Sequence, residues 1–251
     1  MGAAGRRAVE SRLRGLREEL GAGICVVNAE NTADGRGLTP KLAHRLLEAG
    51  ADLLTMGNHT WARRELADWI GGAERIARPG NFSRNAPGRA IAVAPAADGT
   101  SVAALSLQGS LFLDVAHSPW EVVDALVEEA RAAAPVVLVD LHAEATSEKV
   151  AMARWLDGRV TAVIGTHTHV QTADARVLPG GTAAITDAGM TGPHDSVIGV
   201  EADLAIRRMR TGMPVRLEPA TGGVRLEGVL IECDPASGRA FSCEPVRVPV
   251  D

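Results

Sequence analysis

The sequence predicts an α/β fold in which mixed sheets are covered by helices on the outside. In the first two thirds of the chain, short apolar runs alternate with helical patterns, which is the order expected of βα units. The last third reads mostly as strands, which indicates antiparallel pairing beside those units. With 251 residues, the chain is expected to form a single domain over residues 1–251.

The first elements show this alternation clearly. Apolar residues at helical spacing predict an amphipathic helix over residues 5–20. Ile24–Val27 reads as a short buried strand. Thr39 followed by Pro40 predicts the capped start of a helix, which Gly50 is expected to end.

The alternation continues through the middle of the chain. Asp52–Met56 predicts a strand, and Thr60 is expected to cap a helix over Trp61–Ile70. Residues 71–90 are rich in Gly, Pro, Asn and Arg and are expected to form a loop. The hairpin expected next consists of Ala90–Ala94, a turn at Asp98-Gly99, and Ser101–Leu107.

The second half of the chain predicts further βα units and then a β-rich tail. The expected elements are a helix opened by Ser118-Pro119 and ending near Ala133, a strand Val136–Leu141, a helix capped by Thr146 and ending near Leu156, strands Val160–Gly165 and Thr182–Thr186, a short helix or strand at Leu204–Arg210, and antiparallel strands between Val224 and Val248 with a turn at Pro235–Gly238.

Composition and charge narrow the classes of function. The net charge of −5 argues against stable nucleic-acid binding. No apolar stretch approaches the ~18 residues of a membrane span, and the basic N-terminus lacks the apolar region of a signal peptide. The 3 cysteines include no CxxC pair, which fits reduced thiols and a cytoplasmic location.

Two histidines one residue apart, His167 and His169, follow the expected strand Val160–Gly165. Side chains at positions i and i+2 of an extended segment point the same way. Both imidazoles are therefore expected to converge on one point, which suits a transition metal. A polar turn is the alternative interpretation of this pair taken alone.

Side chains able to bind metal directly follow four separate apolar strands. They are Glu30, Asn31, Asn58, His59, His142, His167 and His169. In α/β folds, functional sites gather beyond the carboxyl ends of the strands, so these residues are expected to lie together. Each has an ordinary interpretation on its own, such as a turn amide or a surface carboxylate, but the combination favours a metal site.

The other histidines carry weaker expectations. His44 falls in the middle of a helix and is expected at the surface. His117 lies in a loop and receives no role. His194 could line the pocket, although an ordinary loop histidine is the simpler interpretation.

The donor set combines a carboxylate, amide oxygens and imidazoles without a thiolate. A closed structural zinc site is therefore not expected, whereas iron, manganese or zinc would suit an open, reactive site. The ligands are too many for one tetrahedral ion but enough for two. Two ions ~3.5–4 Å apart can clamp the attacking and leaving oxygens of a phosphoryl transfer, and a carboxylate such as Glu30 can bridge them.

The runs Gly57-Asn-His59 and Gly165-Thr-His-Thr-His169 resemble the calcineurin-like metallophosphoesterases. The chain is more closely similar to their YmdB-like branch, known as 2′,3′-cyclic-nucleotide 2′-phosphodiesterases. The resemblance covers nearly the whole chain. The matching runs are Asn28–Asn31, Thr55–Trp61, His142–Lys149, Gly165–Asp174 and Thr191–Gly199.

This resemblance implies a four-layer α/β/β/α metallophosphoesterase sandwich with mixed sheets. The implied metal ligands are Asn31 and His169 for one ion, Asn58, His142 and His167 for the other, and Glu30 bridging both. His59 is implied to be the general acid. The resemblance also implies two ions of iron or manganese, with zinc less expected, and a homo-oligomer.

One part of the family pattern is missing before Met1. The family begins with a strand ending in Gly-Asp-Val-x-Gly, whose Asp is a metal ligand, and this chain starts at the part just after it. A start placed at an internal methionine and a true loss of the strand are the two explanations. The first is favoured, because losing a central strand would expose sheet edges.

The leading functional hypothesis is a metal-dependent phosphodiesterase acting on cyclic nucleotides, with 2′,3′-cyclic nucleotides as the expected substrates. A hydroxide bridging two ions would attack phosphorus, and His59 would protonate the leaving oxygen. The alternative, motivated by the missing Asp, is a metal-poor, non-catalytic regulatory protein on the same scaffold. A metallo-β-lactamase-like hydrolase fits poorly, because four residues separate His169 from Asp174 where that family needs His-x-His-x-Asp-His. Substrate-binding residues are not identified.

Overall fold

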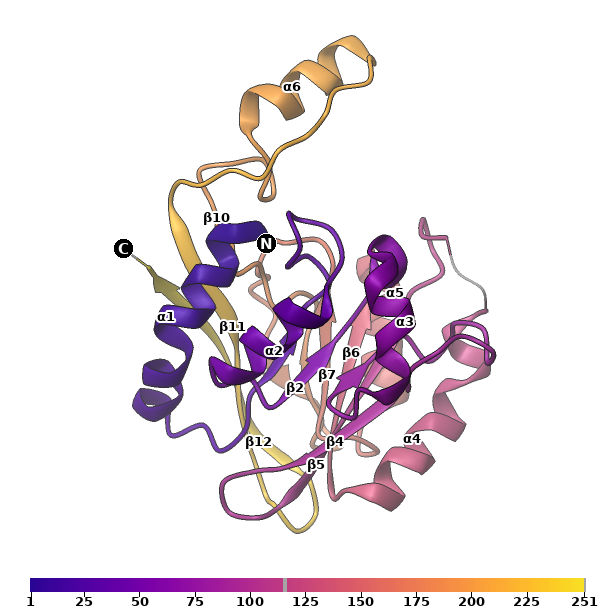
Figure 1. Ribbon diagram of the computed structural model, residues 1–251. Helices are drawn as coiled ribbons and strands as arrows, with labels where there is room; N and C mark the ends of the chain where they lie inside the picture. Colours follow the sequence, from indigo (N-terminus) through magenta and orange to yellow (C-terminus); the bar gives the residue numbers. More distant parts are fainter. Residues whose placement is uncertain (115–116, 251) are drawn as a thin grey trace.

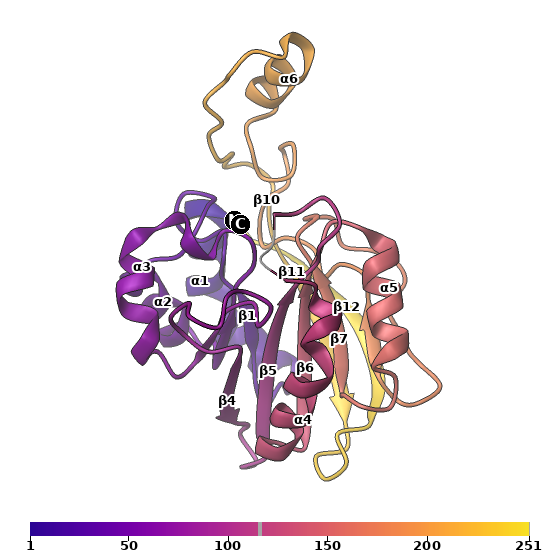
Figure 2. The ribbon, with the colours of Figure 1, turned by 90° about the vertical axis from the view of Figure 1, so that its right-hand side faces the viewer.

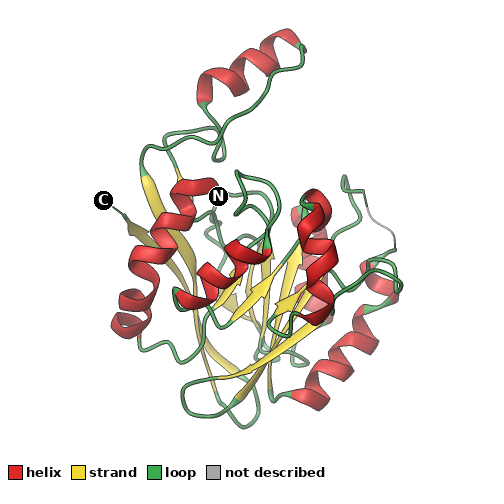
Figure 3. Cartoon of the chain, viewed as in Figure 1, coloured by secondary structure: helices red, strands yellow, loops and turns green. Residues whose placement is uncertain are grey.

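Helices and short strands alternate through most of the chain, and two long strands end it (Figures 1 and 3). The structure is a computed structural model that describes residues 1–114 and 117–250. The elements up to the hairpin are α1 (Gly2–Leu20), β1 (Val26–Asn28), α2 (Pro40–Glu48), β2 (Leu53–Thr55), the 3₁₀ helix η1 (Thr60–Ala62), α3 (Arg64–Trp69), the 3₁₀ helix η2 (Ile70–Gly72), β3 (Ile76–Ala77), β4 (Ile91–Pro95) and β5 (Ser101–Gln108). The later elements are the 3₁₀ helix η3 (Pro119–Glu121), α4 (Val123–Ala133), β6 (Val136–His142), α5 (Thr146–Trp155), β7 (Ala162–Thr166), β8 (Arg176–Val177), β9 (Ala183–Ile185), β10 (Gly192–Pro193), α6 (Ala202–Thr211), β11 (Val224–Cys233) and β12 (Ala240–Pro249).

These elements stack as helix, sheet, sheet and helix. In Figure 2, α1, α2 and α3 lie on one side of the strands, and α4 and α5 lie on the other. Within the described residues, the strands form a parallel sheet β1-β2-β3, an antiparallel sheet β10-β11-β12, and a six-stranded sheet in the order β4-β5-β6-β7-β9-β8. The six-stranded sheet is mixed, because its outer strands β4 and β8 run antiparallel to their neighbours. The four-layer α/β/β/α sandwich with mixed sheets is thus confirmed.

Parallel pairing brings the carboxyl ends of several strands to one edge. In the six-stranded sheet, Gln108 pairs with His142, which pairs with Thr166 on its other side. In the small parallel sheet, Asn28 pairs with Thr55. The segments that leave β1, β2, β6 and β7 therefore begin at the same edge of the molecule, where functional sites of α/β folds gather.

Four apolar clusters of described residues hold the layers together, the smallest of them around Ala162, Ala183 and Ala240. The first lies between α1–α3 and the small parallel sheet, and the second between α4–α5 and the six-stranded sheet. Each fully buried leucine in them stabilises the fold by roughly 1.5–3 kcal/mol. The third, between the two sheets, consists mostly of small side chains, which lets the sheets approach closely. Its buried members are Leu53, Ala77, Ala92, Ala94 and Ala104.

Several expected helix starts are confirmed and others are wrong. Thr39 caps α2 by accepting a hydrogen bond from the Leu42 amide, as predicted. Thr60 does not cap a helix: its hydroxyl donates to the carbonyl of Gly57, and the α-helix begins later, at Arg64. Thr146 is the first residue of α5 rather than its cap, since Ala145 occupies that position.

Short elements account for the other differences. The expected loop over residues 71–90 contains β3, and β8 and β10 were not predicted; each has only two residues, too few to show a hydrophobic period. The helix expected from Pro119 begins as a 3₁₀ turn. The segment left open between helix and strand at Leu204–Arg210 is helical. No described helix has both the length and the apolar character needed to span a membrane.

Candidate metal centre

A buried carboxylate joins the two sheets at the edge where their strands end. The side chain of Asp140, on β6, accepts hydrogen bonds from the Asn28 amide nitrogen at 2.9 Å and from the hydroxyls of Thr55 and Thr166. These donors lie on β1, β2 and β7, so one residue fixes four strands relative to one another. Burial raises the pKa of Asp140. The side chains just beyond these strands are therefore held in a defined geometry.

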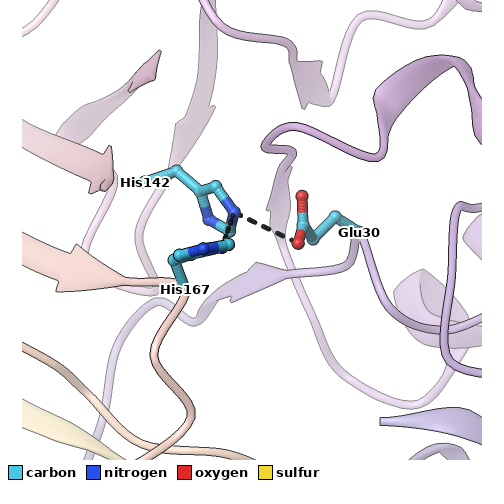
Figure 4. Close-up of side chains that lie close together, drawn as sticks. All are labelled: Glu30, His142 and His167. Atoms are coloured by element: carbon cyan, nitrogen blue, oxygen red, sulfur yellow. Dashed lines mark hydrogen bonds and ion pairs between the residues drawn. The ribbon is translucent and has the colours of Figure 1, made fainter. Parts of the chain in front are cut away.

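Three ligand-type side chains meet at this edge (Figure 4). Glu30, His142 and His167 each place one ligand atom within 4.8 Å of the other two. The Nε2 atom of His142 lies 3.2 Å from Glu30 Oε1 and 3.0 Å from His167 Nδ1. Glu30 follows β1, His142 is the last residue of β6, and His167 follows β7; the three form a candidate metal-binding cluster.

The remaining four predicted residues lie against this cluster. Asn58 places its Oδ1 atom 2.9 Å from His142 Nε2. On the other side of Glu30, the Nδ1 atom of His59 is 3.4 Å from Glu30 Oε1 and 2.9 Å from the Oδ1 atom of Asn31. The amide nitrogen of Asn31 is in turn 3.0 Å from His169 Nε2. All seven side chains thus form one connected group.

In each predicted ligand histidine, the ring nitrogen that points away from the cluster contacts a hydrogen-bond acceptor. We call this nitrogen the outer nitrogen and the other one the inner nitrogen. His142 donates from Nδ1 to the hydroxyl of Thr166, which donates onward to Asp140. His167 places Nε2 3.0 Å from Glu144 Oε2, and His169 donates from Nδ1 to a backbone carbonyl, that of Ile198. These acceptors favour the tautomers whose inner nitrogens carry a free lone pair, which is the form a metal-binding imidazole takes.

The electrostatics of the cluster are dominated by Glu30. Burial opposes its ionisation, but His142 and His59 outweigh burial and hold the pKa of Glu30 far below its ordinary value. Burial likewise opposes a charge on His142, yet the Glu30 carboxylate beside it raises the pKa of His142. Burial and the neighbouring His142 lower the pKa of His167 to about 4, and burial lowers that of His169. Glu30 is therefore ionised, and His167 and His169 are neutral, near pH 7.

The donor set fits a metal ion. Glu30 Oε1 is buried and accepts no hydrogen bond among the described residues, although two histidine nitrogens lie 3.2 and 3.4 Å away. A buried anionic oxygen without a donor is costly unless a cation neutralises it. Carboxylate, amide and imidazole ligands together are typical of an open metal site rather than of a thiolate-bound structural zinc site.

The expected arrangement of the histidine pair is wrong in one respect. β7 ends at Thr166, so His167 and His169 do not share a strand face. Their φ angles are 101° and 67°, a backbone conformation that non-glycine residues rarely adopt. The turn sends the two imidazoles to different places: His167 contacts His142, and His169 contacts Asn31. The alternating pattern of an extended chain could not foresee this turn.

A buried ion pair that the sequence analysis missed holds this turn. Asp187, after β9, accepts from the backbone amide of Thr168 at 3.0 Å and from its hydroxyl at 2.7 Å. The Nζ atom of Lys149 on α5 lies 3.0 Å from the same carboxylate. Asp140 was missed as well, although an acidic residue inside the apolar run of β6 was a visible signal.

Glycines allow the close approach of these segments. A Cβ atom at Gly57 would collide with the ring of His142 and with Glu30 Oε2. One at Gly165 would collide with the backbone carbonyl of Thr186. The glycines of the two short motifs are therefore required by packing around the cluster.

The other histidines lie outside the cluster. His44 is exposed on α2, as expected, and stacks edge-on against Trp69 with 5.3 Å between ring centroids. His117 accepts a hydrogen bond through its backbone carbonyl from Asn81. His194 places Nε2 3.0 Å from the Met190 carbonyl, as an ordinary loop histidine would.

Comparison with known proteins gives consistent similarities over the whole chain. A family model described as YmdB-like protein matches residues 1–246. A Bacillus subtilis (strain 168) protein named 2′,3′-cyclic-nucleotide 2′-phosphodiesterase is 43% identical over 248 residues, covering 99% of this chain and 94% of the relative.

Two solved structures are similar in fold as well as in sequence. A hypothetical protein from Thermus thermophilus superposes with a TM-score of 0.92 and 38% identity, covering 99% of this chain and 96% of that one. A phosphatase from Mycoplasma pneumoniae superposes with a TM-score of 0.90 and 35% identity, covering 99% and 90%.

Proposed function

Because the chain belongs to the YmdB-like protein family, we propose that it is a metal-dependent phosphodiesterase that hydrolyses 2′,3′-cyclic nucleotides. The name of the Bacillus subtilis relative supports this substrate. The observation that carries the proposal is the cluster of Glu30, His142 and His167, in which the outer nitrogens of both histidines are held by acceptors. A metal-poor regulatory role is not favoured, because a ligand cluster with an orphaned carboxylate oxygen is present.

Two metal ions are proposed, and iron or manganese suits the donor set better than zinc. The ligands proposed are Asn58, His142 and His167 for one ion, Asn31 and His169 for the other, and Glu30 between them. When bound, such ions would lower the pKa of water and neutralise charge on a phosphoryl group. The nitrogen and oxygen atoms that now contact one another within the cluster are the atoms that would bind the ions.

His59 is proposed as the general acid. Its Nδ1 atom faces inward, toward Asn31 and Glu30, and its side chain is 25% exposed. The inward contacts orient the ring and leave Nε2 to carry a proton toward the leaving ribose oxygen. General acids of this kind contribute about 10²–10⁴-fold to rate.

The experiment that tests these roles compares three alanine variants of metal-loaded protein. Hydrolysis of 2′,3′-cyclic AMP and bis-p-nitrophenyl phosphate is measured together with bound metal. We expect His59→Ala to lose about 10²-fold or more in turnover while keeping its metal. His142→Ala should lose both, and the matched surface control His44→Ala neither. Parallel loss of metal and activity in His59→Ala would refute the acid role, and no hydrolysis by the unchanged protein would refute the function.

A cytoplasmic location and a homo-oligomeric state are also proposed. A cytoplasmic location is supported by the three cysteines, all of which are free thiols.

A homo-oligomer is supported by α6, which projects from the body in Figures 1 and 2. Ile206 and Met209 on α6, and Met213 just after it, are 47%, 76% and 64% exposed, an apolar face that association would bury.

A further inference from the structure

Aromatic residues gather at the edge of the molecule where the candidate metal centre lies. The chain contains 4 Trp, 3 Phe and no Tyr, so aromatic rings are scarce. Three of them, Trp61, Phe82 and Phe112, lie in segments that leave the carboxyl ends of β2, β3 and β5. Parallel pairing brings these ends to the edge that carries Glu30 and His142. Aromatic surface is therefore available beside the cluster.

Trp61 lies within one turn of the proposed general acid. The 3₁₀ helix η1 directly follows His59, and the Ala62 amide donates to the His59 carbonyl at 3.0 Å. Thr60, on the other side of Trp61, is fully buried, and its hydroxyl donates to the Gly57 carbonyl at 2.6 Å. The backbone that carries Trp61 is therefore held in place next to His59.

Phe82 packs behind Trp61. The two ring centroids are 6.2 Å apart, and the ring planes are inclined by 41°. Phe82 is 9% exposed and Trp61 is 38% exposed, so part of the indole contacts a buried ring and part is open to solvent. A single exposed tryptophan is ordinary on a protein surface. This one is distinguished by a second ring that supports it and by its place beside His59.

The segment that carries Phe82 is bound to the strand next to the cluster. Asn81 is fully buried; its Nδ2 atom donates to the Gln108 carbonyl at 2.8 Å, and its Oδ1 atom accepts from the Gln108 amide at 2.9 Å. Gln108 ends β5 and pairs with His142. The aromatic pair is thus connected to the cluster twice, through η1 to His59 and through Asn81 to the neighbour of His142.

The position of the general acid determines where the nucleoside part of the substrate lies. When a 2′,3′-cyclic nucleotide is hydrolysed at the 2′ position, a water oxygen bonds to phosphorus and loses a proton to solvent. The bond from phosphorus to the 2′ oxygen breaks, and this oxygen takes the proton held by His59, which gives a nucleoside 3′-phosphate. The ribose therefore lies on the His59 side of phosphorus. The base lies there too, because the carbon that carries it is bonded to the carbon that carries the 2′ oxygen.

We propose that the exposed face of Trp61, supported by Phe82, is the surface on which the nucleobase stacks, and that it selects nucleotides over other phosphodiesters. This inference rests on the proposed function and adds the residue that recognises the substrate. Stacking on an aromatic side chain uses the π face that every base presents, so it favours a nucleotide without selecting one base. The apolar character of the aromatic pair agrees with an uncharged base as its ligand.

The test compares two substrates of the Mn²⁺-loaded protein: adenosine 2′,3′-cyclic phosphate and methyl riboside 2,3-cyclic phosphate, in which a methoxy group replaces the base. Trp61→Leu should lower the ratio of their kcat/KM values about 10-fold, mainly by raising KM for the nucleotide. Trp61→Phe should keep most of the ratio, because it keeps an aromatic face.

The matched control is Trp120→Leu, which should keep the ratio of the unchanged chain. Trp120 also lies in a 3₁₀ helix, is 40% exposed and packs against a second ring with 6.5 Å between centroids. An unchanged ratio in Trp61→Leu would overturn the proposal. A loss of the ratio in Val170→Ser instead would also overturn it, because Val170 is 61% exposed and follows His169, so the base would lie there.

A second measurement uses binding rather than turnover. Adenosine 3′-phosphate should quench the tryptophan fluorescence of the unchanged chain and of Trp120→Leu, because a base stacked on an indole quenches its emission. Methyl riboside 3-phosphate should not quench it, and adenosine 3′-phosphate should have little effect on Trp61→Phe. Equal quenching in Trp61→Phe and the unchanged chain would overturn the proposal. Failure of the proposed function is distinct, because it would appear as no hydrolysis of either substrate by the unchanged chain.

Discussion

At the scale of single residues, the candidate metal centre depends on the hydrogen bond that each imidazole makes through the ring nitrogen pointing away from the cluster. The acceptors behind His142, His167 and His169 belong to three different segments. The sequence identifies the histidines because each lies at or just after the end of an apolar strand, where ligands are expected in α/β folds. The acceptors Thr166, Glu144 and Ile198 are found only when the fold brings them into contact with the histidines.

Replacing Thr166 by Val removes the acceptor that orients His142 and leaves the volume nearly unchanged. We expect a 10–100-fold loss of Mn²⁺ affinity, the usual effect of removing such a partner. Isothermal titration of metal-free protein measures it. Thr182→Val, another buried threonine at the amino end of β9, is the matched control and should bind Mn²⁺ normally. Equal affinity in both variants would show that Thr166 does not position the ring.

A second residue-scale prediction concerns pH. Burial raises the pKa of the Cys25 thiol to about 11. The unfolded chain ionises this thiol near ~8.5, so between these values the folded protein binds more protons and stability falls as pH rises. Urea unfolding at about pH 8 and about pH 10 should show the wild type losing free energy of unfolding relative to Cys25→Ala. A difference independent of pH would contradict this prediction.

At the scale of elements, the turn after β7 is the part that the sequence describes least well. Its histidines were expected to extend a strand, but both adopt a rare backbone conformation. Asp187 accepts from Thr168 between them and pairs with Lys149. Two-residue strands and 3₁₀ turns were missed for a related reason. They form because of contacts with other segments, and they are too short to show a hydrophobic pattern of their own. Longer elements such as α2, β5 and β12 were predicted because their periodicity and turn residues are local.

Removing the carboxylate that holds this turn should damage both stability and metal binding. Asp187→Ala leaves Lys149 buried without its partner, which costs about 3 kcal/mol in unfolding free energy. Asp187→Asn keeps the volume and should lose less. Denaturant titration gives the stability, and Mn²⁺ binding at a temperature where both variants are folded gives the affinity. Unchanged Mn²⁺ affinity in a folded Asp187→Ala protein would show that the turn keeps its conformation without Asp187.

At the scale of the whole molecule, the sequence predicted the layers and the edge at which the site forms. Alternating βα units and a β-rich tail gave the α/β class, and the family motifs gave the four-layer sandwich. The projection of α6 from the body could not be foreseen, because it depends on how distant segments of the chain are placed.

The apolar face of α6 predicts self-association. Light scattering coupled to size exclusion should give a mass larger than 26.2 kDa for the unchanged chain. Ile206→Asp combined with Met209→Asp should reduce it to one chain, because charges on the buried face oppose association. The control is Phe241→Asp on β12, a residue that is 66% exposed. A monomer in the unchanged chain, or an oligomer that survives the α6 changes, would contradict this prediction.

Glu30 and the surrounding amide and imidazole groups are proposed to hold a pair of metal ions. The most direct test of this proposal is to saturate metal-free protein with Mn²⁺, remove the excess, and count bound ions by plasma mass spectrometry in the unchanged chain, His142→Ala and His44→Ala. We expect about two ions per chain in the first and third proteins and a marked loss in His142→Ala. The same metal content in all three proteins, or none in the unchanged chain, would contradict it.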